Sequence, residues 1–337
     1  RAPIGKNLVR GCVRLNASVV PSKFSAQAMT MRAFSAEQRK VYGIHAHDGT
    51  EYLKDDKSGD HVGRQQNHIW SAEEIDSELK SLYRHKPVTI SDKFMNFVMS
   101  TLFKTFNFVT GYKEGNATVK SIEWRLIVLE SVAGVPGFVA AGFRHFRSLR
   151  RLQRDHGWIA TLLEEAENER MHLFVCLKMF EASKITRLAV LAAQFTLAPT
   201  LMLVYLVHPR SMHRFVGYLE ETACHTYASI IEQVQRPGTP LHEGWKDLAA
   251  PETAIAYWKL PKDAKWVDAL KCMFADECHH RDVNHTFAEL TPTEPNPFVL
   301  KHKRDAMYAM VLEKEGRTAW PSAEEIANAR IDKAIPA

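Results

Sequence analysis

The chain has 337 residues, 45% of them apolar, so it can bury a sizeable core and lacks the composition of a disordered protein. Its net charge of +5 would suit a nucleic-acid partner, but the charge is unevenly distributed. Residues 1–34 contain six of the 44 basic residues and no acidic residue, so the remainder has 38 basic against 39 acidic residues. This nearly neutral body predicts no nucleic-acid partner.

Residues 1–34 have the composition of an organelle presequence, because they contain Arg and Ser but neither Asp nor Glu. The sequence MRAFSA places Arg32 two residues before Phe34, which resembles a mitochondrial processing site after Phe34. We predict a mitochondrial presequence over 1–34, with a plastid presequence and a basic arm as the alternatives. The polar segment 35–90 is predicted to be an extended N-terminal arm.

The cysteines predict neither a disulfide framework nor a zinc site. Their number is odd and no two of them form a Cys-x-x-Cys pair, so we expect reduced and mostly buried thiols. The five positions are Cys12, Cys176, Cys224, Cys272 and Cys278.

Between residues 91 and 290 the apolar residues recur at spacings of three and four, which predicts long amphipathic helices. Strands and glycine-rich nucleotide-binding motifs are not recognisable. We therefore predict one all-α domain over 91–290, followed by a tail over 291–337. The expected helices cover residues 91–109, 119–145, 155–181, 185–207, 211–236 and 263–290.

Four of these helices carry residues that could bind metal. A Glu and a His three residues apart lie on one face of a helix and can reach the same ion. One such pair is common by chance on a solvated face, but two pairs, each preceded by a helix with a Glu, form the ligand set of dinuclear carboxylate bundles. In chain order the pattern is Glu130, Glu169-x-x-His172, Glu220 and Glu277-x-x-His280.

Burial and charge support this interpretation. Glu130 lies in the sequence LIVLESVAGVPGFVAAGF, which has no other charge, and an unpaired carboxylate there would be unfavourable. Of the adjacent Glu220 and Glu221, we choose Glu220 because Tyr227 lies two turns further along the same face. Four carboxylates balance two divalent cations, and oxygen and imidazole donors suit Fe or Mn.

The sequence ADECHHRDVNH offers two registers, because Asp276 and His279 are also three residues apart. We predict that Glu277 and His280 are the ligands, since they repeat the register of the earlier Glu-x-x-His pair. Asp276 is then a supporting carboxylate and His279 faces away from the metals. His285 is expected to be structural or solvent-facing.

Four motifs in this order resemble those of the alternative oxidases, the di-iron ubiquinol oxidases of the mitochondrial inner membrane. They are LESVAGVPG, WIATLLEEAENERMHL, HRFVGYLEETA and ADECHHRDVNH, and the resemblance extends from about Leu126 to Phe298. It implies a ferritin-like di-iron four-helix bundle with two additional membrane-associated helices. It also implies two Fe ions per chain, bound by the same six residues.

The resemblance implies roles for further residues. Tyr227 matches the family's redox-active tyrosine near the irons. The supporting positions around the metals correspond to Asn168, Asp276, Trp258 and His145. The quinol pocket would be lined by Arg125, Leu129, Ala223 and Thr226. The chain departs from the family at Thr222, where a third consecutive Glu is usual, and this leaves open which group assists quinol deprotonation.

The activity implied is cyanide-insensitive oxidation of two ubiquinols with reduction of O2 to two waters, without proton pumping. The resemblance also implies a homodimer on the matrix side of the mitochondrial inner membrane. The alternatives are a plastid-type plastoquinol terminal oxidase, a ferritin-like iron-oxidising storage protein and a purely structural helical bundle. Iron storage would need a shell-forming assembly and no apolar membrane face.

The segment 188–207 has twenty residues without a charge and is long enough to span a membrane. One crossing would, however, separate His172 from Glu220, which must meet at one site. We predict a monotopic element embedded in one leaflet beside the apolar face of 91–109, with a buried core helix as the alternative. The arginines expected to flank it are Arg144, Arg147, Arg150, Arg151, Arg187, Arg210 and Arg214.

Overall fold

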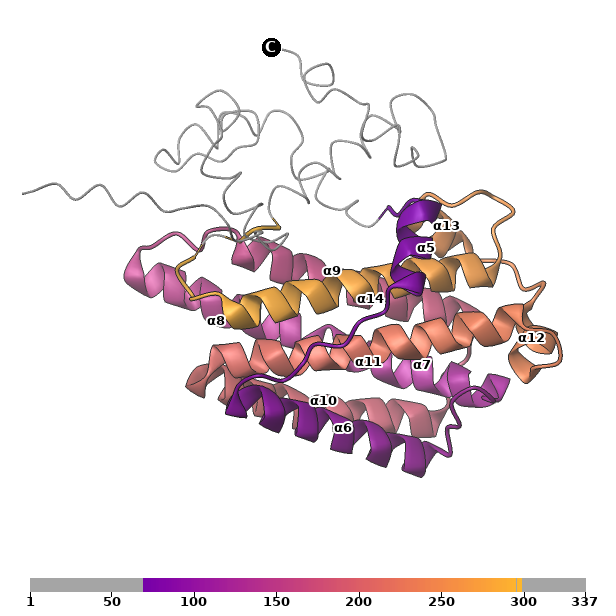
Figure 1. The fold of residues 1–337 in the computed structure, drawn as a ribbon, viewed down its shortest axis with the longest axis horizontal. Coiled ribbons are helices and arrows are strands. Elements are labelled where there is room, and N and C mark those ends of the chain that lie inside the picture. Colours follow the sequence, from indigo (N-terminus) through magenta and orange to yellow (C-terminus); the bar gives the residue numbers. More distant parts are fainter. Residues whose placement is uncertain (1–68, 295, 299–337) are drawn as a thin grey trace, which may run out of the picture.

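The computed structural model describes residues 69–294 and 296–298, and these residues form ten α-helices and no β-strand (Figure 1). The prediction of an all-α fold is confirmed. The predicted presequence, most of the N-terminal arm and most of the C-terminal tail lie outside the described residues. The helices are α5 (Ala72–Lys80), α6 (Ile90–Thr110), α7 (Val119–Ala133), α8 (Val135–Arg151), α9 (Trp158–Met179), α10 (Lys184–Val207), α11 (Pro209–Gln235), α12 (Pro240–Trp245), α13 (Glu252–Trp258) and α14 (Trp266–Glu289).

The four helices that carry the predicted ligands form the centre of the molecule. Helix α11 packs along α14, and α9 packs against both α7 and α14. Helices α6 and α10 lie on one side of this bundle, α6 along α11 and α10 against α7, α8 and α11 (Figure 1). Helix α14 is buried on nearly all sides, whereas α9 buries one face and exposes the other, as its apolar spacing predicts.

The expected single helix over 119–145 is wrong, because the chain forms two helices that meet at Gly134. Pro136 follows at the start of α8, where a proline is tolerated because the amide of that position has no helical partner. Helix α8 then continues to Arg151. Helices α5, α12 and α13 were missed because six to nine residues are too short to show a helical period.

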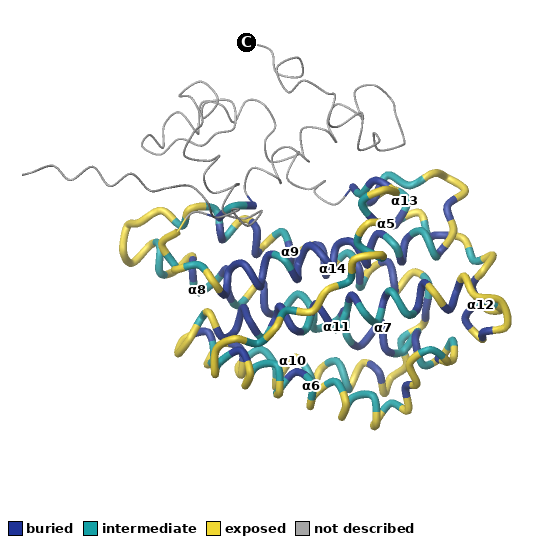
Figure 2. The backbone as a smooth tube through the Cα atoms, in the orientation of Figure 1, coloured by how far each residue is buried: buried dark blue, intermediate teal, exposed yellow. Residues whose placement is uncertain are grey.

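Helix α10 is not a core helix. Only three of its residues are buried, Thr186, Leu201 and Tyr205, so the alternative of a buried core helix is wrong. Figure 2 shows exposed and half-buried backbone along α6 and α10. The large exposed apolar side chains of this face are Ile90, Phe94, Phe97, Leu102, Phe108 and Val109 on α6, and Ile185, Leu188, Leu191, Phe195, Met202, Leu203, Leu206 and Val207 on α10.

Two helical stretches are long and apolar enough to cross a membrane by length and composition alone. They are Val119–Arg151, which is nearly half buried inside the protein, and Lys184–Val207, which is almost entirely exposed. The first stretch contains the break at Gly134 and the buried Glu130. Of these two stretches, only Lys184–Val207 therefore presents a long apolar surface on the outside of the protein.

Two of the seven arginines predicted to flank this surface are instead buried in ion pairs. Arg144 Nε lies 2.6 Å from Asp155 Oδ1, and its guanidinium lies over the Trp158 ring at 3.9 Å. Arg214 Nε lies 3.0 Å from Asp92 Oδ1. The prediction is wrong for these two residues, because a carboxylate holds each guanidinium inside the protein.

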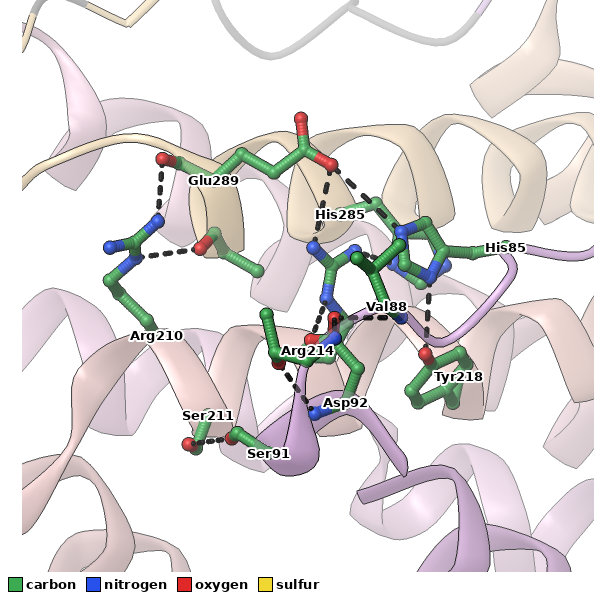
Figure 3. A network of polar contacts seen from close by, with 12 residues as sticks. His85, Val88, Ser91, Asp92, Arg210, Ser211, Arg214, Tyr218, His285 and Glu289 are labelled. Atoms are coloured by element: carbon green, nitrogen blue, oxygen red, sulfur yellow. Dashed lines mark hydrogen bonds and ion pairs between the residues drawn. The ribbon is translucent and has the colours of Figure 1, made fainter. Parts of the chain in front are cut away.

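The extended segment 81–89, which connects α5 to α6, crosses the surface of α11 and α14 (Figure 1). The His85 backbone N–H donates to Glu221 Oε1 at 2.6 Å, and the His85 ring stacks on His285 with centroids 4.7 Å apart. Figure 3 shows Arg214 directed toward His285, and Nη1 of Arg214 lies 2.9 Å from Nδ1 of His285. His285 is therefore buried and structural, the first of its two predicted roles.

Helices α8 and α9 approach so closely that glycine is required at the contact. A Cβ on Gly137 would lie 2.6 Å from the Leu162 carbonyl oxygen and 3.0 Å from the Ala166 Cβ. A Cβ on Gly134 would lie 3.0 Å from the Ala166 carbonyl oxygen. Backbone atoms cannot rotate away as a side chain can, so these glycines set the distance between α9 and the α7–α8 junction.

We expect Gly137→Ala to destabilise the protein by about 1–3 kcal/mol, because the added methyl group clashes with backbone atoms of α9. Gly142→Ala on the same helix is the matched control, since a Cβ there meets nothing within 4 Å and alanine favours a helix. Thermal unfolding of the two variants beside the wild type measures the difference. An equal effect of both substitutions would contradict the close approach.

Candidate metal centre

The structure brings the six predicted ligands together from four helices. They form two overlapping groups, and within each group one donor atom per residue lies within 4.8 Å of the others. The first group is Glu130, Glu169, His172 and Glu277, and the second is Glu169, Glu220, Glu277 and His280. Because Glu169 and Glu277 belong to both groups, the arrangement suits two neighbouring cations with two shared carboxylates.

The donor atoms are buried but poorly satisfied by one another. All six residues are at most 5% exposed. Glu169 Oε2, Glu130 Oε2 and His172 Nδ1 make no hydrogen bond of acceptable geometry, although His172 Nδ1 lies 3.5 Å from both Glu130 and Glu169, and Glu169 Oε1 lies 2.6 Å from His280 Nδ1. Buried polar atoms without partners are rare and unfavourable. The residues present therefore fit a pair of bound cations.

The pKa values show how the metal-free cluster is neutralised. Burial raises the pKa of Glu130 to about 8 and that of Glu220 well above its ordinary value, and neighbouring carboxylates add to both shifts. Burial lowers the pKa of His280, but the charge and hydrogen bond of Glu169, together with the charges of Glu165 and Glu277, raise it to about 9. Without metal, protons thus occupy the positions that cations would fill.

Asp276 organises the surroundings of His172. Its Oδ2 lies 3.0 Å from His172 Nε2 and accepts from Asn168 Nδ2 and from Trp258 Nε1, both at 2.9 Å. A carboxylate only accepts, so Nε2 of His172 carries a proton and Nδ1 is the ring atom that faces the other carboxylates. This carboxylate–histidine arrangement holds an imidazole ready for a metal ion. The resemblance implied these three positions.

The structure does not bring His145 to the cluster, which corrects the expectation that it supports the metals. His145 is exposed on α8, and its ring packs beside Phe146. Its neighbour Arg144 takes the inward direction and binds Asp155. Adjacent residues on a helix point about 100° apart, so only one of the two can face inward.

Tyr227 lies directly beside the cluster. Its hydroxyl donates to Glu130 Oε1 at 2.7 Å. Burial and the Glu130 charge raise the pKa of Tyr227 well above its ordinary value. The phenol therefore keeps its proton and is in contact with a candidate ligand.

The four residues of the expected quinol pocket lie on α7 and α11. Arg125 is buried, with its guanidinium over the rings of Tyr112 and Phe106 at 4.3 and 4.7 Å. Its Nε and NH1 make no hydrogen bond within the described residues. The other three, Leu129, Ala223 and Thr226, are half-buried. Two buried donors on Arg125 are thus available to an oxygen-bearing ligand.

The histidine beside the ligand His280 does not join the cluster. His279 packs between the rings of Trp70 and Phe298, with centroids 6.1 and 5.5 Å away. The predicted register of ADECHHRDVNH therefore agrees with the placement of Glu277 and His280 in one group.

Several residues of the site were missed from the sequence. Trp70 Nε1 donates to Asp276 Oδ1 at 2.6 Å, and the Tyr257 hydroxyl accepts from Asn168 at 2.9 Å. Both come from segments distant in the sequence, so no local pattern identifies them. Glu165 is also buried beside the cluster. Its position four residues before Glu169, on the same helical face, was an available signal.

Comparison with known proteins agrees with this geometry. The family model described as "Alternative oxidase" matches residues 70–289, more than half of the chain. The chain belongs to the alternative oxidase family. Membership of this family makes it an oxidoreductase, and the buried Glu and His cluster is where an alternative oxidase would bind its metal.

Three similar proteins are each named "Alternative oxidase, mitochondrial". The protein from Cryptococcus neoformans var. grubii is 36% identical over 85% of this chain and 76% of its own length. Those from Aspergillus niger and Emericella nidulans are each 48% identical over 58% of this chain and 58% of their own length. The chain thus spans under two thirds of the two latter relatives. Their names support a mitochondrial location for this alternative oxidase.

We expect Asp276→Asn to weaken iron binding about 10- to 100-fold, because Asn cannot hold the His172 tautomer as a carboxylate does. Metal titration of the folded variant measures this loss. Asp263→Asn, at an exposed position just before the same helix, is the control and should bind iron as the wild type does. Equal affinities of all three proteins would contradict the role of Asp276.

Iron binding should release protons at neutral pH, because His280 and Glu130 have raised pKa values and must lose protons to bind a cation. Affinity should therefore fall as the pH is lowered from 8 to 6, by about tenfold per pH unit for each proton released. Anaerobic calorimetry with Fe(II) in buffers of different protonation enthalpy measures the number of protons. An affinity independent of pH would contradict this account.

Proposed function

We propose that the protein is a ubiquinol oxidase of the mitochondrial inner membrane that oxidises two ubiquinols and reduces O2 to two waters at a di-iron centre. The observation that carries the proposal is the buried cluster of four carboxylates and two histidines in a member of the alternative oxidase family. A structural bundle has no use for six buried titratable groups, because burying them is unfavourable.

The donor set favours two iron ions. Four ionised carboxylates balance two divalent cations, which leaves the loaded centre neutral in a low-dielectric core. Oxygen and imidazole donors without thiolate suit iron. When bound, the two irons would supply the electron store and the site of O2 reduction. Glu169 and Glu277, which belong to both groups of donor atoms, would help to hold both ions, while His172 and His280 would each help to hold one.

Tyr227 is proposed to supply an electron during O2 reduction. Its hydroxyl donates to Glu130, so the phenolic proton has an acceptor only 2.7 Å away when the ring is oxidised. The proton would pass only from the Tyr227 hydroxyl to Glu130, so both the electron and the proton would stay within the buried site.

Quinol is proposed to enter from the bilayer. The exposed apolar side chains of α6 and α10 form a face that suits one membrane leaflet, with the protein on the matrix side. Arg125 contacts α6 through Phe106, and its unpartnered donors would orient a quinol oxygen. Leu129, Ala223 and Thr226 would line the pocket, and a homodimer is the proposed assembly.

The overall reaction needs no protons from either side of the membrane. Two quinols release four protons and four electrons, and the formation of two waters from O2 consumes the same numbers. The oxidase is therefore proposed not to pump protons. Of the alternatives, plastoquinol oxidation is disfavoured by the mitochondrial names of the relatives. Iron storage is disfavoured by the exposed apolar face of α10.

Ubiquinol-dependent O2 uptake in the presence of cyanide tests the proposal. We expect His280→Ala to lower the rate more than about 100-fold, since loss of a ligand exceeds the loss of an outer-shell partner. His279→Ala, one residue away and outside the cluster, should keep most of the activity per folded molecule. Metal analysis should find two irons per wild-type chain. Loss of activity in His279→Ala alone would overturn the ligand assignment.

A further inference from the structure

Besides Asp276, another carboxylate that is not a candidate ligand is buried beside the six candidate ligands. Glu165 on α9 is 5% exposed and lies one turn before Glu169. Both of its oxygens accept from Asn284 Nδ2, at 2.9 and 3.0 Å. It belongs to neither group of donor atoms that could hold a metal. The proposed reaction so far leaves this carboxylate without a role.

The hydrogen bonds of Asn284 are arranged so that its amide must face Glu165. Its Nδ2 also donates to the His280 carbonyl oxygen at 3.0 Å, and its Oδ1 lies 3.1 Å from His213 Nδ1. Carboxylate and carbonyl oxygens only accept, so the amide nitrogen faces them and His213 Nδ1 must carry a proton. Asn284 is therefore held from both ends, as expected for a side chain that positions a functional group.

The charges around Glu165 do not include a permanent cation. The groups that act on it are Glu169 on its own helix, His280 and Glu277 on α14, and Glu220 on α11. Burial raises the pKa of Glu165 to about 7, with the neighbouring carboxylates adding to the shift and His280 opposing it. Asn284 is the only donor to Glu165 among the described residues. Its protonation is thus set by the net charge of the centre.

Counting charge shows when Glu165 carries a proton. Two divalent cations balance only the four ligand carboxylates, and Asp276 is already a further buried carboxylate, so an ionised Glu165 would add more uncompensated negative charge to the core. When oxidation adds positive charge to the metal pair, an ionised Glu165 balances part of it. Reduction of the pair therefore favours protonated Glu165, and oxidation favours its carboxylate.

We propose that Glu165, positioned by Asn284, is a proton-holding residue that gains a proton when the metal pair is reduced and releases it when O2 oxidises the pair. This inference rests on the proposed oxidase function. Two quinols lose four electrons and four protons, which reduce O2 to two waters by breaking the O–O bond and forming four O–H bonds. The quinols react one at a time, so protons from the first must be held until O2 is reduced. The O–H bond of Glu165 holds one of them.

Redox difference infrared spectroscopy of the iron-loaded full chain tests this directly. The reduced-minus-oxidised spectrum of the wild type should contain the carbonyl stretch of a protonated carboxylic acid, shifted in D2O. Glu165→Gln should lose this band. Glu167→Gln is the matched control, because Glu167 lies on the same helix but is exposed and paired with Arg170. It should keep the band.

A second variant keeps the test decisive if Glu165→Gln folds poorly. Asn284→Leu removes the donor to Glu165, so the band should move to a different frequency, whereas a band from any other carboxyl group would stay. The inference would be overturned by any of three results. The wild type could lack the band, folded Glu165→Gln could retain it, or the band could stay unmoved in Asn284→Leu. These failures differ from failure of the oxidase function, in which the wild type would bind no iron or consume no O2 with ubiquinol.

Discussion

The mutual repulsion of buried carboxylates is the constraint on which the rest of this structure depends. Four helices each direct a Glu into one low-dielectric core, and two of the four also contribute a His. Such a set is tolerable only when its charge is neutralised by protons, by histidines or by cations. Cations satisfy all six donors at once, so the same repulsion that would destabilise the empty bundle provides the affinity for metal.

This constraint explains why the surroundings of the centre are so fully hydrogen-bonded. Asp276 holds His172 in one tautomer, and Asn168 and Trp258 in turn hold Asp276. The extended segment 81–89 adds an outer brace, because His85 binds Glu221 and stacks on His285, which join α11 to α14. The ligand helices are thereby fixed before a metal arrives, and little reorganisation is needed on binding.

The same arrangement relates the metal site to the apolar face. Helix α6 is exposed along one side, yet its Phe106 contacts Arg125, which lies five residues before Glu130 on α7. A single side chain, Arg125, therefore connects a ring of the exposed helix α6 to the helix that carries Glu130. In the proposed function, this is where a substrate dissolved in lipid would approach the cluster.

The sequence by itself determined the helical class, the six clustered residues and the preference for Glu277 and His280 over Asp276 and His279. These follow from the 3.6-residue period, which decides locally which side chains share a helical face. The period could not reveal the break at Gly134, because two collinear apolar segments show the same pattern as one. The expectation for His145, which the resemblance implied, and those for Arg144 and Arg214 failed because inward and outward positions on these helices are decided by partners such as Asp155 and Asp92.

Only the tertiary structure decided which distant residues complete the site. Trp70 and Tyr257 reach Asp276 and Asn168 from separate short helices or their flanks, and no local spacing connects them. The role proposed for Glu165 depends on Asn284, which lies on another helix and donates to both oxygens of Glu165. The physical reason is the same throughout: a helix period specifies which side chains point together, whereas the partner that each one meets depends on how the helices pack.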